Sequence, residues 1–151
     1  MRKNLIQQEV RNELLTRVNS LTPGSQKQWG KMNVNQMLRH THDGLLMAYG
    51  TIKSAPKGNA VSKALMRFII FNTDMATPKE KADTFPELNM VENNINPENF
   101  EEEKAKLIEI IKNFPQGETY HTSALLGKMT THNWGRLNYT HLHHHFNQFG
   151  V

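Results

Sequence analysis

Apolar side chains recur every three to four residues in four long segments of the chain, which is the period of an amphipathic α-helix. We expect these helices at about residues 4–19, at about 33–52, after Asn96-Pro97-Glu98 and up to Phe114, and at about 131–148. Asn33 and the Asn96-Pro97 pair are expected to begin the second and third helices, because asparagine is a favoured N-cap and proline fits the first turn. The pattern therefore predicts an all-α protein.

A long connection separates the second and third expected helices. Its part from Val61 to Phe71 is apolar enough for a shorter helix, whereas Asn72 to Met90 is polar and contains Pro78 and Pro86. A link of this length allows the helices that it joins to run parallel. We therefore predict a single domain over residues 1–151, a four-helix bundle with a long crossover between helices 2 and 3 that contains a short extra helix.

The composition narrows the class of protein. Hydrophobic residues make up 37% of the chain and its mean hydropathy is −0.64, so we expect a soluble protein. No apolar run approaches the roughly 18 residues of a membrane span, and the N-terminus does not resemble a signal peptide. We expect a cytoplasmic protein without a membrane partner. Because the chain has no cysteine, any metal site must use histidine and carboxylate ligands.

The net charge of +4 is modest, and basic residues alternate with acidic ones over much of the chain. The densest basic region runs from Lys53 to Arg67, and we interpret it as a solvated connection. A nucleic-acid-binding protein usually gathers lysine and arginine on one face. We therefore expect no nucleic-acid partner.

The run from Tyr139 to Phe149 contains the most informative residues of the sequence. His141 and His145 are four positions apart, which places two imidazoles on the same face of a helix, about 6 Å apart at Cβ. The same helix directs His143 to the opposite, polar side and His144 to the edge of the apolar arc. His141 and His145 are therefore expected to point into the core.

Two buried histidines require partners for their ring nitrogens. Hydrogen bonds within the core would satisfy them, and so would a transition metal, since neutral imidazole is a common ligand of zinc, nickel, copper and iron. The residues alone leave both interpretations open. A purification tag does not explain the run, because Leu142 interrupts it and apolar residues follow.

A third ligand is needed for tight binding, and His40 is the candidate because it shares an inward arc with Met37 and Gly44. We interpret Gly44 as a site of close helix packing rather than as space for the metal site. Asp43 could be a fourth ligand or an outer hydrogen-bond acceptor, but we favour an ordinary solvated aspartate. We expect His42, His121 and His132 at the surface, and Trp29 and Trp134 in the core.

Two stretches of the chain resemble a known family. They are Trp29-Gly30-Lys31-Met32 with the following segment to His40, and Trp134 with the segment from Tyr139 to Gly150. They resemble the DinB-like (YfiT-type) superfamily, and most closely a domain-of-unknown-function branch whose members end in His-His-x-x-Gln-Phe-Gly. The resemblance implies a four-helix bundle in which His40, His141 and His145 bind a divalent transition metal, with zinc or nickel expected.

Characterised relatives in that superfamily include metal-dependent transferases and isomerases that use low-molecular-weight thiols. The resemblance thus implies a metal-dependent enzyme that transfers such a thiol to a small electrophilic substrate, although it assigns no catalytic residue. Two alternatives stay open: a hydrolase that activates water at the metal, and a non-catalytic protein that binds a metal or small ligand. The expected partner is a small molecule, and the sequence leaves a homodimer open.

Overall fold

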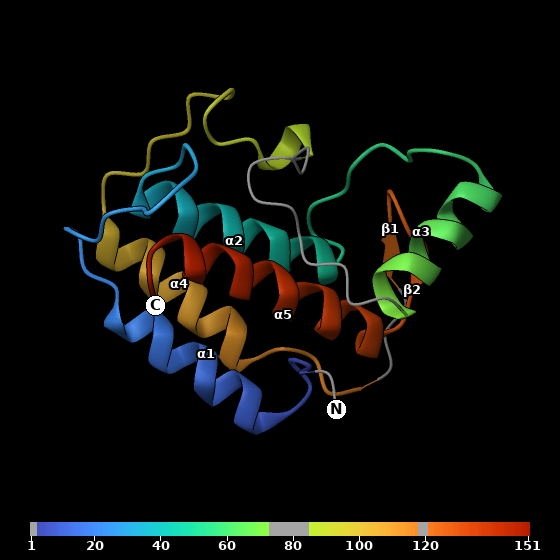
Figure 1. Cartoon of the computed structure of the whole chain (residues 1–151), viewed down its shortest axis with the longest axis horizontal. Helices are drawn as coiled ribbons and strands as arrows, with labels where there is room; N and C mark the ends of the chain where they lie inside the picture. Colours follow the sequence, from blue (N-terminus) through green and yellow to red (C-terminus); the bar gives the residue numbers. More distant parts are fainter. Residues whose placement is uncertain (1–2, 73–84, 118–120) are drawn as a thin grey trace.

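The computed structural model describes residues 3–72, 85–117 and 121–151, and over these residues the protein is almost entirely helical. Its long helices are α1 (Gln8–Ser20), α2 (Val34–Ala48), α4 (Phe100–Lys112) and α5 (Thr131–Gln148). Helix α2 packs on α4 and α5, and α1 packs on the same two helices from the other side (Figure 1). These four contacts close a four-helix bundle, so the predicted all-α fold is confirmed.

The bundle core consists of the apolar stripes that the sequence pattern predicted. Each helix contributes side chains that are completely or almost completely buried, so the core spans all four helices; among them are Leu14 and Val18 of α1, Met37, Leu38 and Leu45 of α2, Leu107 and Ile111 of α4, and Leu142 and Phe146 of α5. Removal of this apolar surface from water is the main stabilising contribution to the bundle.

The beginning of α2 agrees with the prediction, and the beginnings of α1 and α4 do not. Asn33 accepts a hydrogen bond from the Gln36 backbone, and the Gln36 side chain accepts one from the Asn33 backbone, which forms a capping box. Helix α4 is capped by Asn99 instead of the Asn96-Pro97 pair, because the Asn96 side chain accepts a hydrogen bond from Gln36. Helix α1 begins only at Gln8, since Asn4 bonds to the backbone of α5 at His132.

The connection between α2 and α4 contains α3 (Ala60–Asn72) and the short 3₁₀ helix η1 (Pro86–Leu88). Helix α3 confirms the predicted extra helix, whereas most of the expected irregular crossing lies outside the described residues. Arg67 of α3, in the basic region expected to be solvated, donates two hydrogen bonds to the carbonyl of Leu126, which lies between His121–Ser123 and Gly127–Met129. In the described ranges, no helix is long and apolar enough to cross a membrane.

A small antiparallel hairpin was not predicted from the sequence. Strands β1 (His121–Ser123) and β2 (Gly127–Met129) pair with Thr122 opposite Lys128, between α4 and α5 in the chain. Figure 1 shows the hairpin beside α3, at one end of the bundle. Three residues per strand are too few for an alternating pattern to be recognised.

Candidate metal centre

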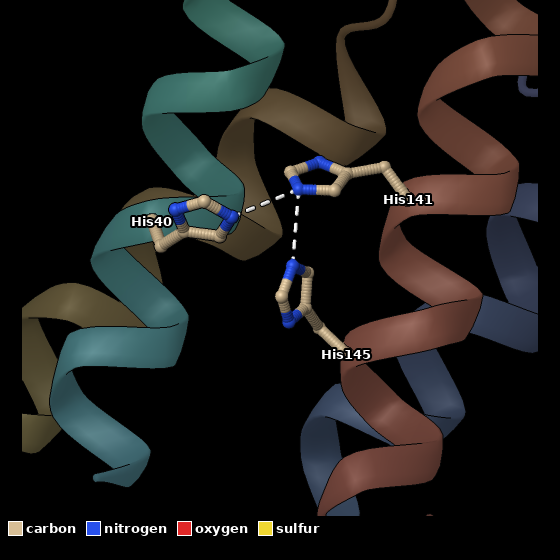
Figure 2. A group of neighbouring side chains, drawn as sticks. All are labelled: His40, His141 and His145. Carbon is tan, nitrogen blue, oxygen red and sulfur yellow. Dashed lines mark hydrogen bonds between the residues drawn. The ribbon is translucent and has the colours of Figure 1, made fainter. Parts of the chain in front are cut away.

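Three histidines from two helices meet between α2 and α5. His40 projects from α2, and His141 and His145 project from α5 toward it (Figure 2). The Nε2 atom of His141 lies 2.9 Å from Nε2 of His40 and 3.1 Å from Nε2 of His145. The sequence prediction that these three residues would share one inward site therefore agrees with the geometry.

The fold of α5 explains why two of the rings converge. Thr130 caps the helix by accepting a hydrogen bond from the Asn133 backbone, so the helical register is set before the first histidine. Residues four apart then lie on one face, and that face packs on α2. His40 is 3% exposed and His145 is 7% exposed, whereas His141 is half-buried.

Hydrogen bonds at Nδ1 determine which nitrogen of His40 and of His145 keeps a lone pair. Nδ1 of His40 lies 2.9 Å from the carbonyl oxygen of Leu88, and Nδ1 of His145 lies 2.6 Å from Oε1 of Gln148. Both oxygens can only accept, so each Nδ1 carries a hydrogen and donates it. In a neutral imidazole, the other nitrogen is then a bare acceptor. Nε2 of His40 and Nε2 of His145 therefore both present lone pairs to His141.

These lone pairs outnumber the hydrogens available to them. Nε2 of His141 carries at most one hydrogen, which it can donate to only one of its two neighbours. At least one acceptor in this buried cluster is left without a donor, which is unfavourable away from water. A cation bound by all three nitrogens would satisfy these lone pairs without any hydrogen-bond donor.

Burial also keeps the three rings neutral. Desolvation lowers the pKa of His40, and it lowers the pKa of His141 well below the ordinary value, with the neighbouring histidines adding to the effect. Desolvation and then the charge of His40 lower the pKa of His145 to about 3. Because imidazole binds metals in its neutral form, all three side chains are available as ligands at neutral pH.

The spacing of the nitrogens is suited to a transition metal. The three ligand atoms lie within 4.8 Å of one another, and His40, His141 and His145 form the one such group found among the described residues. A tetrahedral zinc ion with bonds of about 2.0–2.1 Å separates its nitrogen ligands by about 3.3 Å. The 2.9 and 3.1 Å separations from Nε2 of His141 are slightly shorter than this, and all three ligand atoms lie within 4.8 Å of one another, so small adjustments of the rings would fit the ion.

Comparison with known proteins assigns the chain to a family. A family model described as "Protein of unknown function (DUF1569)" matches residues 2–150. The chain belongs to this family. The match covers both helices that carry the histidines, but its description gives no activity. No curated protein and no solved structure matches the chain significantly.

Gly44 has a more specific role in this family member than the close helix packing that the sequence suggested. A Cβ atom at position 44 would lie 2.8 Å from Cε1 and 3.0 Å from Nδ1 of His141. The first distance is shorter than real Cβ contacts, and the atoms concerned belong to the imidazole ring of His141. The absence of a side chain at Gly44 therefore provides space for His141.

Asp43 and His42 differ from the predictions. Asp43 is 5% exposed rather than solvated, and its carboxylate accepts hydrogen bonds from Nε of Arg39 at 2.8 and 3.0 Å and from Nδ1 of His42 at 3.0 Å. Burial raises the pKa of Asp43, but the hydrogen bonds from His42 and Arg39 outweigh it and leave the pKa lower than usual. The side chain of His42 is 16% exposed because it packs on this carboxylate.

The remaining histidines lie outside the three-histidine cluster. His143 is exposed beside Arg17, as expected, and His132 is exposed at the beginning of α5. His121 is half-buried in β1 instead of lying at the surface, and its ring occupies the space that a side chain at Gly50 would fill. His144 is half-buried, with its ring edge-on to that of Trp29 at 4.8 Å between centroids.

The two tryptophans also differ from each other. Trp134 is 5% exposed and donates a hydrogen bond to the His121 carbonyl, so its predicted place in the core is confirmed. Trp29 is only half-buried. It lies in the loop before α2, where its ring meets the half-buried ring of His144. The prediction that Trp29 would lie in the core is therefore wrong.

Two groups that bind rings of the three-histidine cluster were not identified from the sequence. Gln148 lies three positions after His145 on the same inward arc, and this spacing could have indicated a hydrogen bond. The carbonyl of Leu88 had no such signal, because a backbone oxygen in a connecting segment carries no side-chain signature.

Proposed function

We propose that this protein binds one divalent transition metal, zinc or nickel, through Nε2 of His40, His141 and His145. The convergence of the three Nε2 atoms carries the proposal, since two of them are fixed as acceptors by their Nδ1 hydrogen bonds. A buried cluster of lone pairs without enough donors is unfavourable on its own and favourable around a cation.

The proposed centre is of the catalytic type, with a coordination position left for a substrate. Three protein ligands are typical of catalytic zinc sites, whereas structural sites use four. Asp43 was the candidate for closing the site, but Arg39 and His42 occupy its carboxylate oxygens. In the part of the chain that the structure describes, no fourth histidine or acidic side chain joins the group.

The neutral ligand set favours an anionic substrate group. Three imidazoles leave the double positive charge of a bound ion uncompensated, and such an ion lowers the pKa of a coordinated thiol. The chain has no cysteine, so a thiol would have to come from a small molecule. We infer an enzyme that transfers a low-molecular-weight thiol to a small electrophile, in agreement with the resemblance to the DinB-like superfamily.

The residues of the chain would contribute orientation and a dry environment. His40 is held by Leu88 and His145 by Gln148, so the two rings need little reorganisation on binding. Burial of both rings excludes water from their side of the site and strengthens electrostatic interactions there. His141 is half-buried, so the substrate would approach from its side.

Cobalt substitution tests this function directly. Cobalt-loaded protein is titrated with cysteine, glutathione and coenzyme A, and a sulfur ligand is detected as a new charge-transfer band in the near ultraviolet. We expect the band with wild type and not with a His141→Ala variant under the same conditions. The His132→Ala variant is the matched control, because it removes an exposed histidine of the same helix.

Two negative results have different meanings. Cobalt binding without a thiol band or a thiol-dependent shift in melting temperature would reject thiol transfer and leave a hydrolase or a binding protein. Absence of cobalt binding by the wild type would reject the metal centre itself.

A further inference from the structure

We propose that Gln148 is a positioning residue that fixes His145 as an Nε2 ligand, and that the loop between α1 and α2 packs beside the Gln148 amide and keeps it against His145. This inference rests on the proposed metal centre. The hydrogen bond with the Gln148 amide would determine which nitrogen of His145 is available to the ion.

The contact between the two side chains is short and buried. Oε1 of Gln148 lies 2.6 Å from Nδ1 of His145, and the two residues are 8% and 7% exposed. They are three positions apart on α5, so they lie on the same face of one helix. Water has little access to replace this hydrogen bond.

The orientation of the amide has a chemical consequence. With the carbonyl oxygen toward His145, Nδ1 must carry the hydrogen, and Nε2 is a bare acceptor that faces His141. With the NH₂ group toward His145, Nδ1 would have to accept and Nε2 would carry the hydrogen. That second arrangement would block Nε2 as a ligand. The amide orientation therefore determines whether His145 can bind the ion with Nε2.

The loop before α2 packs against the NH₂ end of the amide. A Cβ atom at Gly30 would lie 2.6 Å from Nε2 of Gln148, so the glycine backbone occupies the space directly beside it. Gly30 also has a φ of +87°, a conformation that favours glycine. The backbone N–H of Gln28, in the same loop, donates a hydrogen bond to the backbone carbonyl of Gln148 at 2.7 Å. This bond attaches the loop to the end of α5.

The other two ligands are held differently. His40 donates to the backbone carbonyl of Leu88, which no side-chain substitution removes. Nδ1 of His141 has no hydrogen bond to any of the residues that the structure describes, and it lies beside Gly44. Among the described residues, Gln148 is thus the side chain whose hydrogen bond to one of the three histidines can be removed by mutation.

Zinc affinity of three variants tests the assignment, measured by competition with a chromophoric chelator. Gln148→Leu removes the acceptor, and we expect zinc to bind about 10–100-fold more weakly, as for other partners of metal-bound histidines. Gln148→Glu keeps an acceptor and no donor, so it should bind zinc at least as tightly as wild type. Asn147→Leu is the matched control, because it removes a neighbouring amide that bonds to Arg17 instead of a ligand.

A second measurement does not depend on how well the variants fold. In zinc-loaded wild type, nitrogen NMR shifts of His145 should show a protonated Nδ1 and a metal-bound Nε2. Zinc bound at Nδ1, or a folded Gln148→Leu variant with wild-type affinity, would overturn the positioning role while the metal centre stands. Failure of the wild type to bind zinc would overturn both the metal centre and this inference.

Discussion

The imidazole of His141 occupies the space that a side chain at Gly44 would fill. A Cβ atom at Gly44 would lie 2.8 Å from Cε1 and 3.0 Å from Nδ1 of that ring. Gly44 lies one turn after His40 on α2, so the same helix supplies one histidine of the cluster and the space for another. The approach of α2 to α5 is therefore coupled to the position of the His141 ring.

The first prediction follows from this contact. Gly44→Ala should displace the His141 ring and weaken zinc binding by about tenfold or more, as expected when the orientation of a ligand is disturbed. Overpacking costs about 1–3 kcal/mol, while the better helix propensity of alanine returns about 1 kcal/mol. The metal-free protein should therefore lose about 0–2 kcal/mol of stability and stay folded. Denaturant unfolding measures this loss, and chelator competition measures the zinc affinity.

Gly24→Ala is the matched control for that substitution. Its nearest neighbour would be Oγ1 of Thr22 at 3.9 Å, an ordinary contact, so zinc affinity should be unchanged. A Gly44→Ala protein with wild-type affinity would show that His141 does not need this space to bind the ion.

The second prediction concerns the ligands themselves. Elemental analysis of protein purified without a nickel column should find about one zinc or nickel ion per wild-type chain, as expected for a single three-histidine site. Separate replacement of His40, His141 and His145 by alanine should abolish most of this content. His143→Ala should retain it, because His143 is exposed and bonds to Arg17. Metal loss in the His143 variant together with metal retention in the His141 variant would contradict the ligand assignment.

The positions of the three histidines could be predicted because helix periodicity determines them. The four-residue spacing of His141 and His145 fixes their common face, and His40 shares its arc with the buried Met37. The orientation of these rings could not be predicted to the same extent. It depends on Leu88, whose backbone carbonyl reaches His40 only after the crossover folds over α2.

Other differences also arise from tertiary contacts. The sequence pattern predicted that α4 would begin at the Asn96-Pro97 pair, but Gln36 binds the Asn96 side chain and Asn99 is the actual cap. The burial of Asp43 likewise requires Arg39 and His42 to satisfy its carboxylate, although the four-residue spacing of Arg39 and Asp43 was visible in the sequence.

The third prediction concerns pH. In the unfolded chain, histidine has a pKa near 6.5, whereas burial lowers the pKa of His40, His141 and His145 in the folded chain. Below pH 6.5 the unfolded state therefore binds more protons than the folded state, and the free energy of unfolding decreases as the pH is lowered. The slope is at most about 1.4 kcal/mol per pH unit for each such histidine.

Denaturant unfolding of chelator-treated protein between pH 6.5 and 5 measures this slope, since most carboxylates stay ionised there. A His145→Gln variant should show a shallower dependence, and His132→Gln, which changes an exposed residue, should match wild type. Equal stability of the wild type across this range would mean that the three rings are not buried and neutral.

The fourth prediction concerns removal of the metal. At a free metal concentration about a thousand times the dissociation constant, binding adds roughly 4 kcal/mol to the stability of the folded state. A chelator should therefore lower the melting temperature. It should leave the helical circular dichroism at room temperature intact, because the bundle core consists of apolar side chains from all four long helices. Loss of helicity on chelation would show that the bundle depends on the ion to fold.

The last prediction separates a ligand role for Asp43 from a structural one. Asp43→Asn keeps the shape of the side chain but removes the charge that pairs with Arg39 and accepts from His42. Because the Arg39 side chain is 39% exposed, solvent screens part of this pairing, and we expect a loss of about 1–3 kcal/mol in stability. Metal content should be unchanged.

Glu102→Gln is the matched control for the charge, because Glu102 pairs with Lys106 on the exposed side of α4. An exposed pair contributes little, so this variant should keep both stability and metal content. If Asp43→Asn stayed folded but lost its metal while Glu102→Gln did not, Asp43 would have to bind the ion in the loaded protein. The centre would then be closed by a fourth protein ligand, and thiol transfer would lose the coordination position on which it depends.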